Sequence, residues 1–155
     1  MQNNEEAMSS ISAKLTERRD YWMNKINEMS GYLEKIDSVV TLESQIYPLR
    51  QEAVENFHNL SASLAKITKE YKEKTATLYK DIRMQKVAPG STSYMFPTES
   101  AIKEQVESTY SFDKWLIDVM SNHVDYLDNT IKTIDGIIYG ISNRIKLEEL
   151  KLGRG

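Results

Sequence analysis

The 155-residue sequence contains no cysteine, and proline (three) and glycine (six) are scarce. Without cysteine the chain has neither a disulfide framework nor a thiolate metal site, and it fits a reducing compartment such as the cytoplasm. Proline and glycine interrupt helices, so their scarcity favours long helices. Three phenylalanines and two tryptophans are few large residues for a core. Much apolar surface is therefore expected to be buried between helices or between subunits.

The sequence also lacks a long hydrophobic run. Its most apolar stretch, residues 131–145, carries Lys132, Asp135 and Arg144, and is too short and too charged to span a bilayer. The acidic N-terminus has no apolar segment typical of a signal peptide. At this length we expect one domain, because domains commonly contain roughly 100–200 residues.

Motifs of bond chemistry are missing as well. The sequence contains no HExxH, no Cys/His cluster, no GxxxxGK[ST] or GxGxxG loop and no GxSxG elbow. We therefore expect no enzymatic activity, no metal and no cofactor. Of the two histidines, His58 and His123, the second lies on an apolar helix stripe. We interpret it as a satisfied histidine within an interface between helices.

What the sequence does contain is helical periodicity. Apolar residues from Met8 to Val40 recur mostly at intervals of three and four, the pattern of an amphipathic helix. Gly31 interrupts this pattern and indicates a bend. Pro48 disfavours helical geometry at the residue before it, so the first helix is predicted to end near residues 45–48.

Three further helices are predicted, over residues 49–87, 99–108 and 112–150. The second has a coiled-coil-like seam from Phe57 to Leu78, interrupted by Lys74. The loop at 88–97 contains Tyr94 and Phe96, and Thr98 and Ser111 are candidate caps of the two following helices. The predicted fold is all-α, with a helix hairpin, a long C-terminal helix at 111–150 and an additional N-terminal helical segment at 1–35.

The last helix carries the strongest apolar stripe. Gly136 and Gly140 share one face, which allows another backbone to approach closely. The stripe fits either an intramolecular core or a subunit interface, and we slightly favour the interface. The predicted interface residues are Trp115, Val119, Tyr126, Ile131, Ile134, Gly136, Ile138, Gly140, Ile141 and Ile145.

Positive charge is concentrated in one segment, although the net charge of the chain is −3. Residues 66–86 hold seven basic and three acidic side chains, a local balance of +4. Viewed down the helix axis, most of these cations lie within an arc of about 120° on the side opposite the seam, and Glu73 lies within the same arc. Such a face can bind successive phosphates, with a base stacked on Tyr79, or it is simply a solvated charged surface. The candidate nucleic-acid-binding residues are Lys66, Lys69, Lys72, Lys74, Tyr79, Lys80, Arg83 and Lys86.

The order and spacing of several elements resemble the phage recombination mediators related to UvsY of the T-even phages. The resemblance covers about residues 36–153, including a long helix to Asp81. A second register, through Leu127-Asp128 and Ile131-Lys132, aligns almost equally well. The matching elements are Ile36-Asp37-Ser38, Leu42, Glu43, Trp115, Ile134, Tyr139, Gly140, Ile141 and Gly153.

The chain departs from the family at some basic positions. Thr75 and Thr77 stand where the family has basic residues, and Ile137 stands where it has an arginine. The resemblance implies a protein that binds single-stranded DNA and helps load a recombinase onto strands covered by single-strand-binding protein. It also implies a ring-like homo-oligomer that hydrolyses no nucleotide.

Two other functions compete with this interpretation. A structural or adaptor coiled-coil protein of a phage would oligomerise without nucleic-acid affinity. Binding to a membrane surface is the weakest alternative, because the basic face lies opposite a narrow seam rather than a broad aromatic one.

Overall fold

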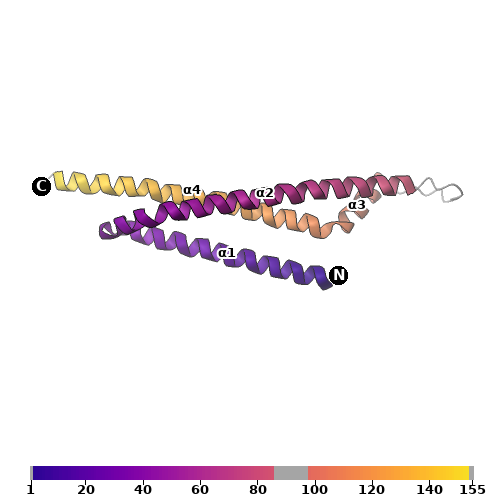
Figure 1. The fold of residues 1–155 in the computed structure, drawn as a ribbon, viewed down its shortest axis with the longest axis horizontal. Helices are drawn as coiled ribbons and strands as arrows, with labels where there is room; N and C mark the ends of the chain where they lie inside the picture. Colours follow the sequence, from indigo (N-terminus) through magenta and orange to yellow (C-terminus); the bar gives the residue numbers. More distant parts are fainter. Residues whose placement is uncertain (1, 86–97, 154–155) are drawn as a thin grey trace. The chain divides into compact units, whose positions relative to one another are not determined.

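The computed structural model describes residues 2–85 and 98–153 and confirms an all-α fold. The elements are α1 (Gln2–Glu34), a 3-10 turn (Ile36–Ser38), α2 (Val39–Gln85), α3 (Glu99–Thr109) and α4 (Ser111–Gly153) (Figure 1). Within the described ranges there is no strand. The predicted loop at 88–97, with Tyr94 and Phe96, lies outside them, as does Val87.

The chain divides into two compact units. Unit 1 comprises residues Met1–Leu60 and Asn122–Gly155, and unit 2 comprises Ser61–Ser121. The long helices α2 and α4 each supply residues to both units, whereas α1 belongs to unit 1 and α3 to unit 2.

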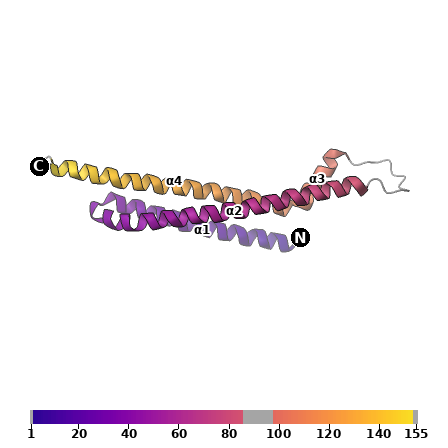
Figure 2. The ribbon, with the colours of Figure 1, turned by 45° about the horizontal axis from the view of Figure 1, so that its top comes forward.

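Unit 1 is a bundle of three helices: α1, the first part of α2 and the second part of α4 (Figures 1 and 2). The Tyr126 hydroxyl donates to the Arg19 carbonyl at 3.1 Å, and the Leu33 side chain lies against Gly140. Both contacts advance together along the chain, so α1 and α4 run in the same direction. The tight turn after α1 reverses the chain, and α2 runs antiparallel to α1.

The core of unit 1 draws on all three helices. Trp22 of α1, Ile46 of α2 and Ile134 of α4 are at most 2% exposed. Burying such side chains contributes on the order of 1.5–3 kcal/mol each, so the N-terminal segment at 1–35 is an integral part of this unit. The cluster comprises Trp22, Met29, Val39, Leu42, Ile46, Leu49, Ala53, Leu127, Ile134, Ile137 and Ile141.

The first predicted helix boundary is wrong. The chain turns at Lys35 and the 3-10 segment, and α2 continues through Pro48. A proline inside a helix removes a hydrogen bond and costs about 3 kcal/mol. Here Pro48 is exposed, while its neighbours Ile46 and Leu49 are buried. Burial on both sides of the proline offsets its cost, and α1 likewise continues through Gly31 to Glu34.

The earlier turn also removes two residues from the first predicted stripe. Ile36 and Val40 belong to the turn and to α2, and they are 40% and 77% exposed. Their spacing from Leu33 follows helical periodicity only by coincidence, because the helix has already ended.

Unit 2 is built around the short helix α3, whose predicted position is confirmed to within one residue. The Thr98 hydroxyl accepts a hydrogen bond from the Ala101 amide at 3.2 Å, so the predicted cap is present. Ile102 and Val106, one turn apart on α3, are buried. The seam residues of α2 in this unit, such as Leu64 and Leu78, are half-buried.

Candidate nucleic-acid interface

The basic face of α2 is exposed along its length. We define it as Lys66, Lys69, Lys72, Lys80 and Arg83, and all five side chains are exposed. Lys86, predicted as part of the same face, lies outside the described residues. The helix extends without interruption over these positions, so the cations share one face, with Glu73 among them.

Two members of the basic face have acidic neighbours. Lys69 lies 3.9 Å from Glu73, and Arg83 lies 3.8 Å from Glu99 of α3. All four side chains are more than half exposed, and such pairs contribute little to stability. In the described part of the chain no carboxylate pairs with Lys66, Lys72 or Lys80. These three lysines are therefore available to an anionic ligand.

Lys74 was also predicted as a nucleic-acid-binding residue, and the structure places it in the seam, outside the basic face. Its ammonium group lies 3.4 Å from the Asp113 carboxylate at the start of α4. This contact explains why a lysine interrupts the apolar seam: the seam faces α4 here, and the lysine has an acidic partner there. Lys74 is thus engaged within the chain rather than presented on the basic face.

Tyr79 borders the basic face from the α3 side. Its hydroxyl donates to the Glu99 carboxylate at 3.4 Å, and the Arg83 guanidinium lies 5.7 Å from the ring centroid. A cation above a tyrosine ring is attracted by the negative face of the ring. The phenol is therefore held by contacts on two sides rather than extended into solvent as a free stacking platform.

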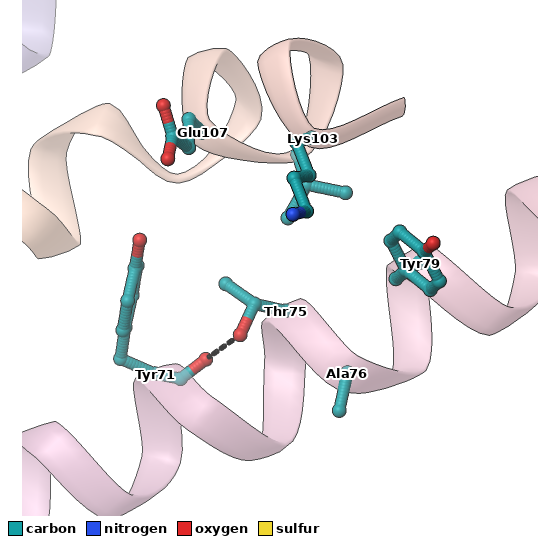
Figure 3. Close-up of a pocket in the computed structure, with 7 residues that line it drawn as sticks. Tyr71, Thr75, Ala76, Tyr79, Lys103 and Glu107 are labelled. Carbon is teal, nitrogen blue, oxygen red and sulfur yellow. Dashed lines mark hydrogen bonds between the residues drawn. The ribbon is translucent and has the colours of Figure 1, made fainter. Parts of the chain in front are cut away.

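Between α2 and α3 lies a cavity of about 480 Å³, which the sequence did not predict (Figure 3). Helix α2 supplies one side and α3 the other. Residues 71, 75 and 79 recur every four positions and so share one helix face, which is a signal the sequence contained. What faces them could not be predicted, because the two walls are far apart in the sequence. The lining residues are Tyr71, Thr75, Ala76, Tyr79, Lys103, Val106 and Glu107.

Two residues of the predicted oligomer stripe lie in the core of a single chain, and three more pack against that core. Ile134 and Ile141 are 0% and 5% exposed, and Ile131, Ile138 and Tyr126 pack against the same cluster. Ile134 and Ile141 are therefore buried by α1 and α2 of the same chain, whereas the other three stay partly exposed. Trp115 is half-buried and stacks on Phe112, with 5.9 Å between ring centroids, and Val119 is half-buried as well.

The two glycines of α4 differ. A side chain at Gly140 would meet Leu33 of α1, whereas nothing lies within 4 Å of the corresponding position at Gly136. The close approach predicted for this pair is thus made at Gly140, within the chain. Ile145, at 39% exposed, stays available to another molecule, together with Leu147, Leu150 and Leu152 further along the helix.

His123 is buried in unit 1, as its position on the stripe indicated, but it is not fully satisfied. Its Nδ1 atom has no hydrogen-bond partner among the described residues. The ring stacks on Tyr126 at 6.0 Å between centroids. Burial, followed by the nearby charges of Arg19 and Arg18, lowers the pKa of His123 below its ordinary value of 6.5.

Residues 2–85 and 98–153 include no cluster of three or more acidic, histidine or cysteine side chains suited to a metal ion. No described helix is both long and apolar enough to cross a bilayer. No protein-family model, curated protein or solved structure matches this chain. The resemblance to the UvsY-related mediators therefore rests on the residues quoted above.

Proposed function

We propose that this protein binds single-stranded DNA through the basic face of α2 and acts, without enzymatic activity, as a recombination mediator that helps load a recombinase. The observation that carries the DNA-binding step is the row of exposed lysines without carboxylate partners, Lys66, Lys72 and Lys80. Lysines spaced along a helix can contact successive phosphates and release counterions. The mediator role is inferred from the resemblance.

Multivalency would strengthen the interaction. The net charge of −3 makes a single copy a weak polyanion binder, so several copies on one strand are needed for tight binding. Because the core covers Ile134 and Ile141, contacts between copies are proposed for the exposed end of α4 instead, through Ile145, Leu147, Leu150 and Leu152.

The test is fluorescence anisotropy of a labelled single-stranded oligonucleotide at low and moderate salt. We expect affinity to fall log-linearly with salt, with a slope of about −0.7 per neutralised phosphate. The variant Lys72→Glu with Lys80→Glu should bind much more weakly and show a shallower slope. Neither lysine has a carboxylate three or four residues away, so the substitutions add no repulsion along the helix.

The matched control is Lys14→Glu with Lys35→Glu, which makes the same charge change at exposed lysines outside both the basic face and the end of α4. Equal loss of affinity in both double variants would mean that overall charge, not this face, governs binding. Absence of binding at low salt would contradict the proposed function. The mediator step is then tested by the rate at which a recombinase loads on strands coated with single-strand-binding protein.

An adaptor protein without nucleic-acid affinity is the second candidate, favoured by the leucines at the end of α4. Leu147 and Leu152 are 54% and 81% exposed, and exposed apolar groups of this kind often mark protein-binding surfaces. Sedimentation of the Leu147→Asp with Leu150→Asp variant tests this surface. The adaptor function would be supported if this variant no longer forms oligomers and the unaltered protein does not bind DNA.

A further inference from the structure

We propose that the cavity between α2 and α3 takes up one base of the bound strand and favours guanine or cytosine. This inference rests on the proposed function, because the base reaches the cavity as part of single-stranded DNA held on the basic face. It adds a base-reading site to a phosphate-binding surface.

One wall of the cavity is a stacking surface. Figure 3 shows the Tyr71 ring edge-on, with one flat face toward the open space above Thr75. Tyr79 stands two helical turns further along α2, about 12 Å away by helix rise, and closes the other end. Bases stack well on tyrosine, and each such contact is sequence-tolerant because every base has a π-face.

The floor of the cavity is apolar. The Thr75 hydroxyl donates to the Tyr71 carbonyl at 2.9 Å, which turns it back onto its own helix. Its methyl group points toward α3 (Figure 3). Val106, which is buried, lines the cavity from α3. The floor therefore presents an apolar surface to the flat face of a base.

The rim carries one donor and one acceptor. Lys103 and Glu107 lie one turn apart on α3, and in the described ranges neither is held in an ion pair. Figure 3 shows the Lys103 side chain reaching from α3 toward α2, over Thr75. An ammonium donates to a base carbonyl, and a carboxylate accepts from an exocyclic amine. Guanine and cytosine carry both groups, whereas thymine lacks the amine and adenine lacks the carbonyl.

Charge complementarity identifies the occupant as a nucleotide rather than an apolar side chain. Lys72 directly follows Tyr71 and Lys80 directly follows Tyr79, and both lysines are exposed. Lys72 lies about 100° around the helix from Tyr71, at the edge of the basic face nearer the cavity, so a strand that places a base on Tyr71 can bring a phosphate to Lys72. A hydrophobic residue of a partner protein would fill the cavity without using these lysines.

The experiment compares oligothymidylates that differ at one central position: guanine, cytosine, adenine, thymine or an abasic sugar. Competition anisotropy at low salt measures their relative affinities. We expect guanine and cytosine strands to bind most tightly, and the abasic strand at least roughly 5-fold more weakly, because it loses one stacked base. Tyr71→Ala should remove the difference from the abasic strand, and Tyr71→Phe should retain it.

A second variant is needed because Tyr71 also belongs to the apolar seam, so that its truncation can disturb helix packing. Lys103→Ala changes an exposed side chain, and it should erase the advantage of guanine over adenine, which lacks the carbonyl, while leaving the salt dependence intact. Tyr139→Ala, at an exposed tyrosine of unit 1, is the matched control and should change neither quantity. Circular dichroism checks the helicity of every variant.

Each outcome decides between the two proposals. Salt-dependent binding that is lost in Lys72→Glu with Lys80→Glu, but equal for all five strands, would overturn the base site and leave the proposed function standing. A Tyr71→Ala variant that weakens the intact and abasic strands equally would do the same. If no strand binds, the proposed function fails and the base site fails with it.

Discussion

The two units of this chain are built from similar long helices, but they differ in how much apolar surface those helices bury. In unit 1 three helices bury tryptophan, methionine and branched aliphatic side chains in one continuous cluster. In unit 2 the buried apolar side chains described are Ile102, Val106 and Met120, and α2 and α3 line an open cavity. Stability is thus concentrated in one unit, whereas the exposed cations of α2 lie in the other.

The difference follows from what each helix face meets. Along residues 61–85 of α2, Lys74 and Thr75 interrupt the apolar seam, and lysines occupy the opposite face. Along residues 39–60, apolar side chains such as Leu42, Ile46 and Leu49 continue without a charged interruption. Surfaces that bind ligands are commonly drawn from the less stable parts of a protein, because they must stay exposed.

The largest expected effect comes from the same truncation in each unit. Ile134→Ala in unit 1 and Ile102→Ala in unit 2 remove side chains that are 0% and 1% exposed. We expect Ile134→Ala to lower the free energy of unfolding by about 2–5 kcal/mol. Ile102→Ala should cost less, because a short helix such as α3 can settle into the space. Urea unfolding measures both, and a larger cost at Ile102 would break the comparison.

Alanine substitutions at the two glycines of α4 test how closely α1 packs against α4 in unit 1. Gly136→Ala should raise stability by about 0.5–1 kcal/mol, because alanine has the higher helix propensity and nothing lies within 4 Å of the new methyl group. At Gly140 the new carbon would lie 2.8 Å from Cδ2 of Leu33, so Leu33 must shift and the gain should shrink or reverse. Thermal unfolding compares the variants. A loss at Gly136 instead would indicate that another copy of the chain packs there.

The smallest expected effect is a pH dependence that originates in unit 1. Burial, together with Arg19 and Arg18, lowers the pKa of His123 in the folded chain, so the unfolded chain takes up the proton first. Stability should therefore be full above the ordinary pKa of 6.5 and should fall as the pH drops from there through the lower folded value.

Unfolding midpoints measured across this pH range check the prediction. The variant His123→Gln should flatten the profile, and His58→Gln, at an exposed histidine of α2, serves as the control. A profile that is unchanged in His123→Gln would show that other groups carry the pH dependence.

Much of the secondary structure was predictable, because helical periodicity and capping are local. The intervals of three and four residues located α4, and the Thr98 cap located the start of α3. The turn before α2 was not predictable from Pro48. A proline biases only its immediate backbone, and here the buried neighbours Ile46 and Leu49 outweigh that bias.

The candidate site was predicted in part. The exposure of the basic face follows from spacing alone and is observed. The ion pair of Lys74 could not be predicted, because its partner Asp113 is 39 residues away in the sequence. Tyr71, Lys103 and Glu107 were missed as neighbours for the same reason. Only the packing of α3 on α2 brings them to one cavity.

The sequence by itself determined that the chain forms long helices, which faces of them are apolar, and where cations gather. Those properties depend on residues within one or two turns of each other. The tertiary structure decided what covers each apolar face: Ile134 and Ile141 lie under α1 and α2 of the same chain rather than against a second copy. An apolar stripe indicates that a helix face will be buried. The hydrophobic effect is non-directional, so the stripe alone does not specify which surface covers it.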